Sequence, residues 1–136
     1  MAKKMTIGIG SACIEKLTSV GVIISGAAAE DMEVNVFVLV NAGHAFLKNA
    51  KKEENCSDEE KAQEFKESLE KLSTPHWTEF FEMAKEMTEV NVYICSLAGK
   101  VAGGESKEDF LEFIDEIVGI GEYIDSATEA DVNLFI

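Results

Sequence analysis

The stretch VNVYICSLAGKVAGGESKEDF, residues 90–110, decides how the rest of the chain is interpreted. Its first six residues alternate between aliphatic and more polar positions, which is typical of a β-strand with two different faces. We expect this strand to end at Cys95 and to open into a glycine-containing loop. A helix is then expected from Ser106, with Asp109 as the partner in a capping box. The sequence therefore predicts a thiol at a strand end, where proteins built on parallel sheets bind their ligands.

Two more strands are predicted towards the N-terminus. Residues 6–10 (TIGIG) and 34–40 (VNVFVLV) are short apolar runs, and the second is so uniformly apolar that it predicts a central strand covered on both faces. Between them, apolar residues recur every three to four positions, so we expect a helix from Ile14 to about Ala29, with Ser11 as its N-cap.

The composition changes between the second and third strands. The segment from about residue 50 to residue 73 is strongly charged, which predicts an exposed helical insert. Its helix is expected to have Ser57 as N-cap and to end near Leu72. Thr74 and Pro75 then mark the start of a more apolar helix, because proline is favoured at the first helical position. That helix is expected to lead back to the strand that ends at Cys95.

The C-terminal part continues the alternation of helices and strands. We expect a short strand near Glu116–Val118, a turn with Gly119 and Gly121, a helix to about Ala130 and a final strand at Val132–Ile136. The pattern predicts an α/β fold with three layers, in which a mostly parallel five-stranded sheet carries helices on both faces. At 136 residues, the chain is expected to form a single domain, 1–136.

The composition also narrows the class of protein. A net charge of −14 makes this an acidic protein and argues against a nucleic-acid or anionic-membrane partner, since phosphates are bound by clustered Lys and Arg. No apolar run reaches the roughly 18 residues of a membrane span, and the start lacks the pattern of a signal peptide. We therefore expect a cytoplasmic protein, in which Cys13, Cys56 and Cys95 are thiols.

In a parallel sheet, the loops that leave the carboxyl ends of the strands share one edge, and ligands bind there. Cys13 follows the first predicted strand, His44 the second and Cys95 the third, while the turn at 119–121 follows the fourth. His76, at the start of a helix, is also expected near this edge. The order of elements therefore predicts a shared edge with two thiols and a histidine.

The chain resembles the DsrE/DsrF-like family of small sulfur-transfer proteins. The resemblance covers nearly the whole length outside 50–73 and rests on three segments: GAAAEDMEVNVFVLVNAG (26–43), VNVYICSLAGKVAGG (90–104) and FLEFIDEIVGIGEYIDSATEADVNLFI (110–136). It implies a DsrE-like, flavodoxin-like topology and a homo-oligomer of three or more subunits. It also implies that Cys95 carries sulfane sulfur as a persulfide, received from or passed to a sulfur-carrier protein.

Each candidate catalytic residue has a second interpretation. Cys95 is favoured as a thiolate by the amides that follow it and by Lys100, but a cysteine at a strand end is often only a small buried residue. Cys13 is a second thiol for resolving or passing on a persulfide, or a packing residue. His44 is a proton donor or a cation beside a thiol, or it caps the preceding strand.

Two other kinds of function stay open. One is a non-catalytic module that binds a small anion or nucleotide at the same edge, and the other is a structural subunit of a hetero-oligomeric sulfur-relay complex. We expect no cofactor, because the glycines near 99–104 do not form a dinucleotide fingerprint. No metal is expected either, since His44, His76 and two cysteines lack the spacing of metal ligands. Cys56 is expected to be exposed and unactivated, among carboxylates.

Overall fold

The computed structural model describes residues 2–50 and 59–136, so Cys56 and the predicted cap Ser57 lie outside the described residues. In chain order the elements are β1 (Lys4–Ile9), α1 (Ile14–Ala29), β2 (Glu33–Val38), the 3₁₀ helix η1 (Val40–Phe46), α2 (Glu59–Lys71), α3 (Trp77–Met87), β3 (Val90–Cys95), α4 (Ser96–Ala102), the 3₁₀ helix η2 (Lys107–Asp109), β4 (Glu116–Val118), α5 (Ile120–Glu129) and β5 (Val132–Phe135). Among the described helices, none has the length and hydrophobicity needed to span a membrane.

The five strands form one sheet in the order β4-β3-β2-β1-β5, and all four neighbouring pairs are parallel. The predicted α/β fold, with a five-stranded parallel sheet and helices on both faces, is confirmed. The strand order corrects one detail, because a flavodoxin-like sheet has the order 2-1-3-4-5. Here the chain moves steadily from β1 to β4, and a single long crossover brings β5 back beside β1.

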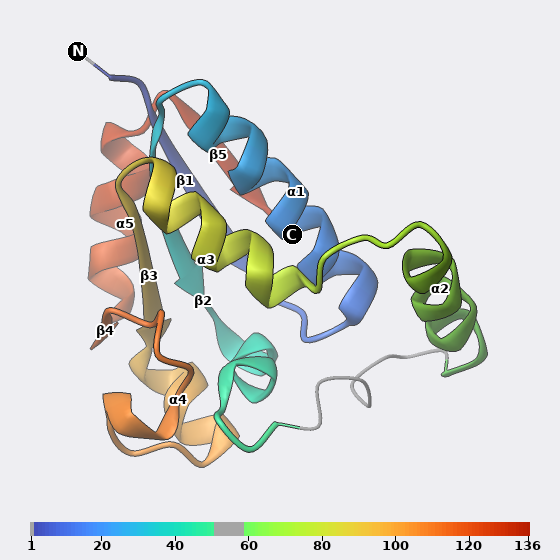
Figure 1. Ribbon diagram of the computed structural model, residues 1–136. Coiled ribbons are helices and arrows are strands. Elements are labelled where there is room, and N and C mark those ends of the chain that lie inside the picture. Colours follow the sequence, from blue (N-terminus) through green and yellow to red (C-terminus); the bar gives the residue numbers. More distant parts are fainter. Residues whose placement is uncertain (1, 51–58) are drawn as a thin grey trace.

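The two faces of the sheet are covered unequally. Helices α1 and α3 lie side by side on one face, and α5 lies on the other (Figure 1). On the α1–α3 face, Val34, Val36 and Val38 of β2 are fully buried. On the α5 face, Glu33 and Asn35 of the same strand remain half-exposed. The prediction that this strand is covered on both faces is therefore wrong for part of the α5 face, where polar residues of β2 border an opening.

Two helices have N-cap residues other than those predicted. The N-cap of α1 is Cys13, and the Oγ of Ser11 accepts a hydrogen bond from the Cys13 N–H at 3.1 Å. The N-cap of α3 is His76, not Thr74. Its backbone N–H donates to the carboxylate of Glu79 at 3.0 Å, which closes a capping box with an imidazole in place of the usual hydroxyl.

The segment after β3 differs most from its prediction. Helix α4 begins at Ser96, directly after Cys95, where a loop was expected. It ends at Gly103, whose φ of 86° lies in the left-handed region that glycine adopts readily. The capping box of Ser106 and Asp109 is present, but it opens only the single turn η2 instead of a helix. The amides of Glu105 and Ser106 donate to the Asp109 carboxylate and hold its pKa below its ordinary value.

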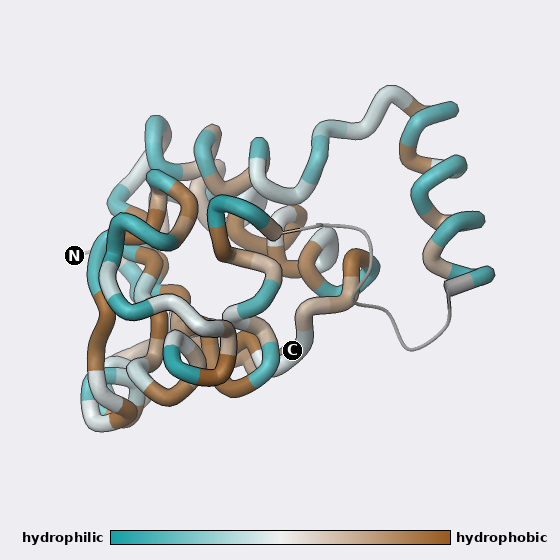
Figure 2. Tube along the Cα trace, turned by 90° about the horizontal axis from the view of Figure 1, so that it is seen from below, coloured by the Kyte–Doolittle hydropathy of each residue, from teal (hydrophilic) through white to brown (hydrophobic). Residues whose placement is uncertain are grey.

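The charged segment behaves as predicted where the structure describes it. Helix α2 projects away from the layered body of the protein (Figure 1, Figure 2). Its apolar stripe is thin, with Phe65 and Leu69 half-buried, and Leu72 just after the helix is 76% exposed. The predicted exposed helix is therefore present, outside the part of the fold that positions the candidate site.

Candidate functional site

The carboxyl ends of the strands meet at one edge because all described strand pairs are parallel. Cys13, as N-cap of α1, follows β1, and His44 lies in η1 after β2. Cys95 is the last residue of β3, and Gly119, the N-cap of α5, follows β4. The structure thus places the predicted site residues on segments that leave the same edge.

Cys95 is buried, with 7% of its surface exposed, and immediately precedes α4. In the register of the sheet it is the partner of Val118 on β4. Because side chains alternate along a strand, Cys95 belongs to the same face of β3 as Tyr93, which is the α5 face. Its thiol is therefore enclosed near the end of that face instead of lying open at the edge.

The strands that lead to the two thiols are separated by another strand. β2 lies between β1 and β3, and neighbouring strands lie about 4.8 Å apart, so the strands that lead to Cys13 and Cys95 are about 10 Å apart. A disulfide needs Cα atoms within about 7 Å. Both residues are thiols in this structure. The strands that lead to the two thiols are therefore not neighbours, and Cys13 lies four residues beyond the end of β1.

His44 is half-buried in η1, which packs on α4. The approach is so close that a Cβ at Gly43 would lie 2.7 Å from the carbonyl oxygen of Ala98. Glycine at 43 therefore allows η1 to reach the helix that begins after Cys95. Among the described residues, however, no hydrogen bond joins His44 to Cys95. The element that carries His44 packs on the helix that follows Cys95, but the two side chains make no direct polar contact.

A cavity of about 400 Å³ opens beside α4, and we call it the α4 cavity. It is lined by Ser96, Gly99, Lys100, Gly103, Gly104, Glu105 and Ile117. Ser96 is the residue next to Cys95, and Lys100 places one positive charge at the wall. The α4 cavity is thus the opening that lies nearest in sequence to the predicted reactive thiol.

The residues at the start of α3 lie elsewhere. Trp77 is 1% exposed and packs against Phe46 and Phe81, with ring centroids 5.0 Å and 5.7 Å away, so it is a core residue. His76 caps α3 and borders a small cavity together with Ile14 at the start of α1. Within the described ranges, no group of three or more His, Cys, Asp or Glu side chains is arranged to hold a metal ion.

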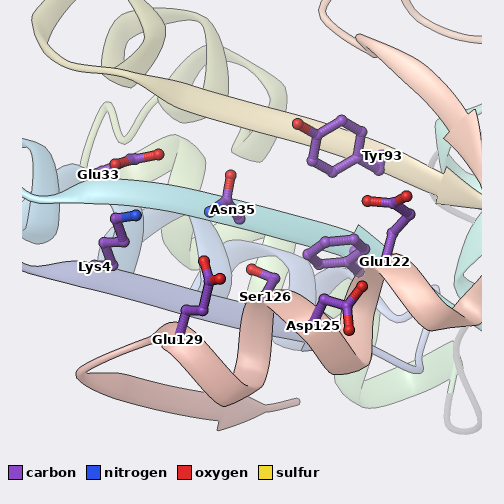
Figure 3. A pocket seen from close by; sticks show the side chains of 9 residues that line it. Lys4, Glu33, Asn35, Tyr93, Glu122, Asp125, Ser126 and Glu129 are labelled. Carbon is purple, nitrogen blue, oxygen red and sulfur yellow. The ribbon is translucent and has the colours of Figure 1, made fainter.

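A second opening lies between α5 and the half-covered face of the sheet, and we call it the α5 cavity (Figure 3). Its volume is about 220 Å³, and its lining consists of Lys4, Glu33, Asn35, Phe37, Tyr93, Glu122, Asp125, Ser126 and Glu129. The sequence patterns did not predict this cavity. One sequence feature could have indicated it: the tripeptide Val-Asn-Val occurs in two apolar strands, at 34–36 and 90–92. The asparagine places a polar amide on one face of each strand.

The two amides belong to a polar row that crosses four strands in register. The row consists of Asn133, Thr6, Asn35 and Asn91. Two of its members hold α5 on the sheet: the Thr6 hydroxyl lies 2.7 Å from the Ser126 hydroxyl, and Asn133 Nδ2 donates to the Ala127 carbonyl at 2.8 Å. The other two, Asn35 and Asn91, bond to each other where α5 no longer covers the sheet.

The phenol of Tyr93, at the wall of the α5 cavity, has a shifted pKa. Burial raises the pKa of its phenol above the ordinary value, and the carboxylates of Asp115, Glu116, Glu122 and Glu89 raise it further. A phenolate is disfavoured by low polarity and by neighbouring negative charge. The potential around this side chain is therefore negative.

Comparisons with known proteins agree with this fold. The profile of the DsrE/DsrF/DrsH-like family matches residues 41–135. Among solved structures, the chain is similar to a protein of unknown function, MTH1491 from Methanobacterium thermoautotrophicum, with a TM-score of 0.64 over 98% of this chain and 99% of that one. The two sequences are 13% identical, so this similarity concerns the fold. No curated protein matches the chain.

Proposed function

Because the chain belongs to the DsrE/DsrF/DrsH-like family, we propose that it takes part in sulfur relay and that Cys95 is the thiol that carries the sulfur. The observation that supports this choice is the position of Cys95 at the carboxyl end of β3, at the edge where parallel sheets bind ligands. Helix α4 begins at the next residue, so its first amides lie beside the thiol.

The proposed chemistry is thiol exchange and needs no cofactor. The Cys95 thiolate attacks the outer, sulfane sulfur of a donor persulfide, the donor's S–S bond breaks, and the donor leaves as a thiolate. Cys95 then holds the sulfur as a persulfide. An acceptor thiolate attacks that outer sulfur, takes it, and restores the Cys95 thiolate. Each step forms one bond to sulfur and breaks one, so no oxidant or reductant is consumed.

Burial of Cys95 limits how the sulfur arrives. With 7% of the residue exposed, a bulky donor meets the thiol only if the surrounding elements move apart. The α4 cavity, with Ser96 and Lys100 in its wall, is the proposed approach, and its lysine would stabilise the negative charge of the thiolate that leaves the donor. We therefore propose that transfer is coupled to a small displacement of α4.

Cys13 and His44 have supporting roles in this proposal. The separation of β1 and β3 favours Cys13 as a thiol that passes sulfur to a partner, instead of one that closes a disulfide with Cys95. His44, on the element that packs on α4, is proposed to supply a proton to the departing donor thiolate.

The proposal includes a partner and an assembly. The donor or acceptor is a sulfur-carrier protein, and the scheme requires reduced thiols, as in the cytoplasm. We also propose a homo-oligomer of three or more subunits. Its support is a set of large apolar side chains at the carboxyl edge that are at least 49% exposed. Each ends a strand or lies two residues after one: Val40, Leu97, Ile120 and Phe135.

A second candidate function rests on the α4 cavity alone. Its volume of about 400 Å³ lies in the range of small-ligand sites. Lys100 and the backbone of three glycines offer hydrogen-bond donors to a small anion, against the one carboxylate of Glu105 in the same lining. In that case Cys95 is a packing residue. The rate at which a thiol reagent modifies Cys95 in the presence of a competing anion separates the two functions.

The test of sulfur transfer is direct. The protein is incubated with a low-molecular-weight persulfide, and its peptides are examined by mass spectrometry for one added sulfur atom. We expect the adduct on the Cys95 peptide. Cys95→Ser is expected to remove it and Cys13→Ser to retain it. An adduct that persists in Cys95→Ser, or a wild-type protein without one, contradicts the proposal.

The assembly is tested separately by light scattering. We expect a mass of at least three times the 14.9 kDa of one chain. A monomer would contradict the assembly but would leave the proposed chemistry of Cys95 in place.

A further inference from the structure

The turn between β2 and η1 holds a valine in a conformation that valine rarely adopts. The φ of Val40 is 40°, in the left-handed region that favours glycine, asparagine and aspartate. For a β-branched residue such a φ is an outlier, because the Cβ comes too close to the following carbonyl oxygen. Strained residues of this kind are concentrated at active sites and in segments that switch between conformations.

One hydrogen bond closes the turn in which Val40 is strained. The Ala42 N–H donates to the Leu39 carbonyl at 3.0 Å, so residues 39–42 form a tight turn with Val40 at its second position. Turns with a positive φ at that position are dominated by glycine, asparagine and aspartate. The Val40 side chain is 49% exposed, so its burial contributes little to holding this conformation. The strain is therefore relieved when the turn opens.

The segment that contains Val40 is anchored to the body of the protein on both sides. Before the turn, the Leu39 N–H donates to the Ile9 carbonyl at 2.8 Å. At the end of η1, the Leu111 N–H donates to the carbonyl of the fully buried Phe46 at 2.9 Å. A rotation about the backbone of Val40 therefore displaces the part of η1 that lies between these two anchors.

That part of η1 lies against α4 (Figure 1). A Cβ at Gly43 would lie 2.7 Å from the Ala98 carbonyl oxygen and 3.4 Å from the Ala102 Cβ, so the two backbones are in close contact. Helix α4 begins directly after Cys95. A displacement of η1 at Gly43 therefore removes a contact that holds α4 in place next to the thiol.

We propose that Val40 is a strained hinge that favours an open form, in which η1 and α4 move apart and the Cys95 thiol becomes accessible. The strain raises the free energy of the closed form and is absent from the open form, so it increases the population of the open form. This inference rests on the function proposed for Cys95, because it supplies the displacement of α4 that a donor needs to reach a residue with 7% of its surface exposed.

The experiment measures how fast a small thiol reagent modifies Cys95 in the folded protein, with the Cys95 peptide followed by mass spectrometry. Val40→Asn places a residue that tolerates a positive φ in the turn. Because the strain is then reduced, the closed form becomes more stable. We expect the modification of Cys95 to be about fivefold slower than in the wild-type protein.

Two control variants separate the hinge from other effects. Val40→Thr also makes the side chain polar, but it keeps the branched Cβ and therefore the strain, so the rate is expected to stay within about twofold of the wild-type rate. Gly26→Ala stabilises α1 and leaves Val40 unchanged. It is expected to leave the rate unchanged, because a local opening does not depend on the stability of the whole domain.

Three results overturn the inference. A rate in Val40→Asn that equals or exceeds the wild-type rate would show that the strain does not favour opening. Equal slowing in Val40→Thr would show that the loss of an apolar side chain is responsible. Slowing in Gly26→Ala in proportion to its gain in stability would show that the reagent reaches Cys95 through global unfolding.

The hinge and the proposed sulfur transfer can fail separately. The thiol reagent reports access to Cys95 whether or not this residue carries sulfur. If Val40→Asn slows the reagent and a persulfide donor leaves no sulfur on Cys95, the hinge stands and the proposed function fails. If a persulfide forms on Cys95 and Val40→Asn slows neither reaction, the function stands and the hinge fails.

Discussion

Asn91 donates a hydrogen bond from its Nδ2 to the Oδ1 of Asn35, 3.0 Å away on the neighbouring strand. The two residues are register partners in β3 and β2, and both are half-exposed on the α5 face. Their bond satisfies one polar atom of each amide on a face that α5 covers incompletely. It fixes the base of the α5 cavity and gives a physical reason for asparagine within two otherwise apolar strands.

Replacing both members of this pair is expected to cost less than the two single changes added together. Asn35→Leu or Asn91→Leu each leaves a partly buried amide without its partner, at about 1 kcal/mol in the free energy of unfolding. The double variant leaves no unpaired amide, so a double-mutant cycle by urea unfolding should show a coupling of about 0.5 to 1 kcal/mol. Additive losses would mean that the bond contributes nothing to stability.

Two glycines are expected to respond to alanine in opposite directions. A Cβ at Gly104 would lie 2.5 Å from the ring of Phe110, which is fully buried, so Gly104→Ala should destabilise the protein by about 1 to 3 kcal/mol. Gly26, in α1, has no atom within 4 Å of such a Cβ. Gly26→Ala should stabilise the helix by about 0.5 to 1 kcal/mol. Thermal unfolding of both variants checks the two signs.

The titration of Tyr93 is expected to respond to Glu122, a carboxylate that lines the α5 cavity. In Tyr123→Phe, Tyr93 is the remaining tyrosine, and tyrosinate absorbance should report a pKa above the ordinary value of about 10. Glu122→Gln should lower this pKa, whereas Glu112→Gln, away from Tyr93, should not change it. A pKa that is insensitive to Glu122 would mean that burial, the largest cause, and the carboxylates of Asp115 and Glu116 account for the shift without it.

The same shift has a consequence for stability. Above the ordinary pKa, the folded protein holds a phenol proton that the unfolded chain releases, so the folded state binds more protons. The contribution of Tyr93 is therefore fully present below pH 10 and is lost as the pH rises through the raised value. Tyr93→Phe should show a weaker loss of stability at alkaline pH in urea unfolding.

The two described thiols are expected to react in a fixed order. In a Cys56→Ser background, Cys13 is half-buried and Cys95 is 7% exposed, so a thiol reagent should modify Cys13 first. Cys95 should react at the rate at which α4 opens, and the two rates should converge in urea. Immediate reaction of Cys95 in the folded protein would mean that the thiol is open without any movement.

Much of the fold follows from local patterns. The predicted range of α1, from Ile14 to about Ala29, matches the observed helix because its apolar repeat is long and ends before a turn, and the short strand β4 was also placed correctly. The shared edge of the sheet followed from the alternation of strands and helices. These features depend on periodicity, which is visible in a single sequence.

The features that were missed depend on contacts between distant segments. The sequence LAGKVAGG suggested a loop, but Gly99 faces the buried Ile94 and Phe110, so packing holds this segment as a helix. The α5 cavity was missed because its walls come from three strands and α5, and Asn35 and Asn91 become neighbours only through the register of β2 and β3. Local propensity carries no information about such pairings.

The pairing of β1 with β5 joins the first strand of the chain to the last. Gly10 donates to the carbonyl of Ile136, and Ile136 donates to the carbonyl of Gly8, at 2.8 Å and 2.9 Å. During synthesis, one side of β1 therefore stays without its partner until Ile136 has left the ribosome. We expect folding to be completed only after all five strands have been translated. Until then the nascent chain exposes the unpaired edge of β1, and this form is the most prone to misassembly.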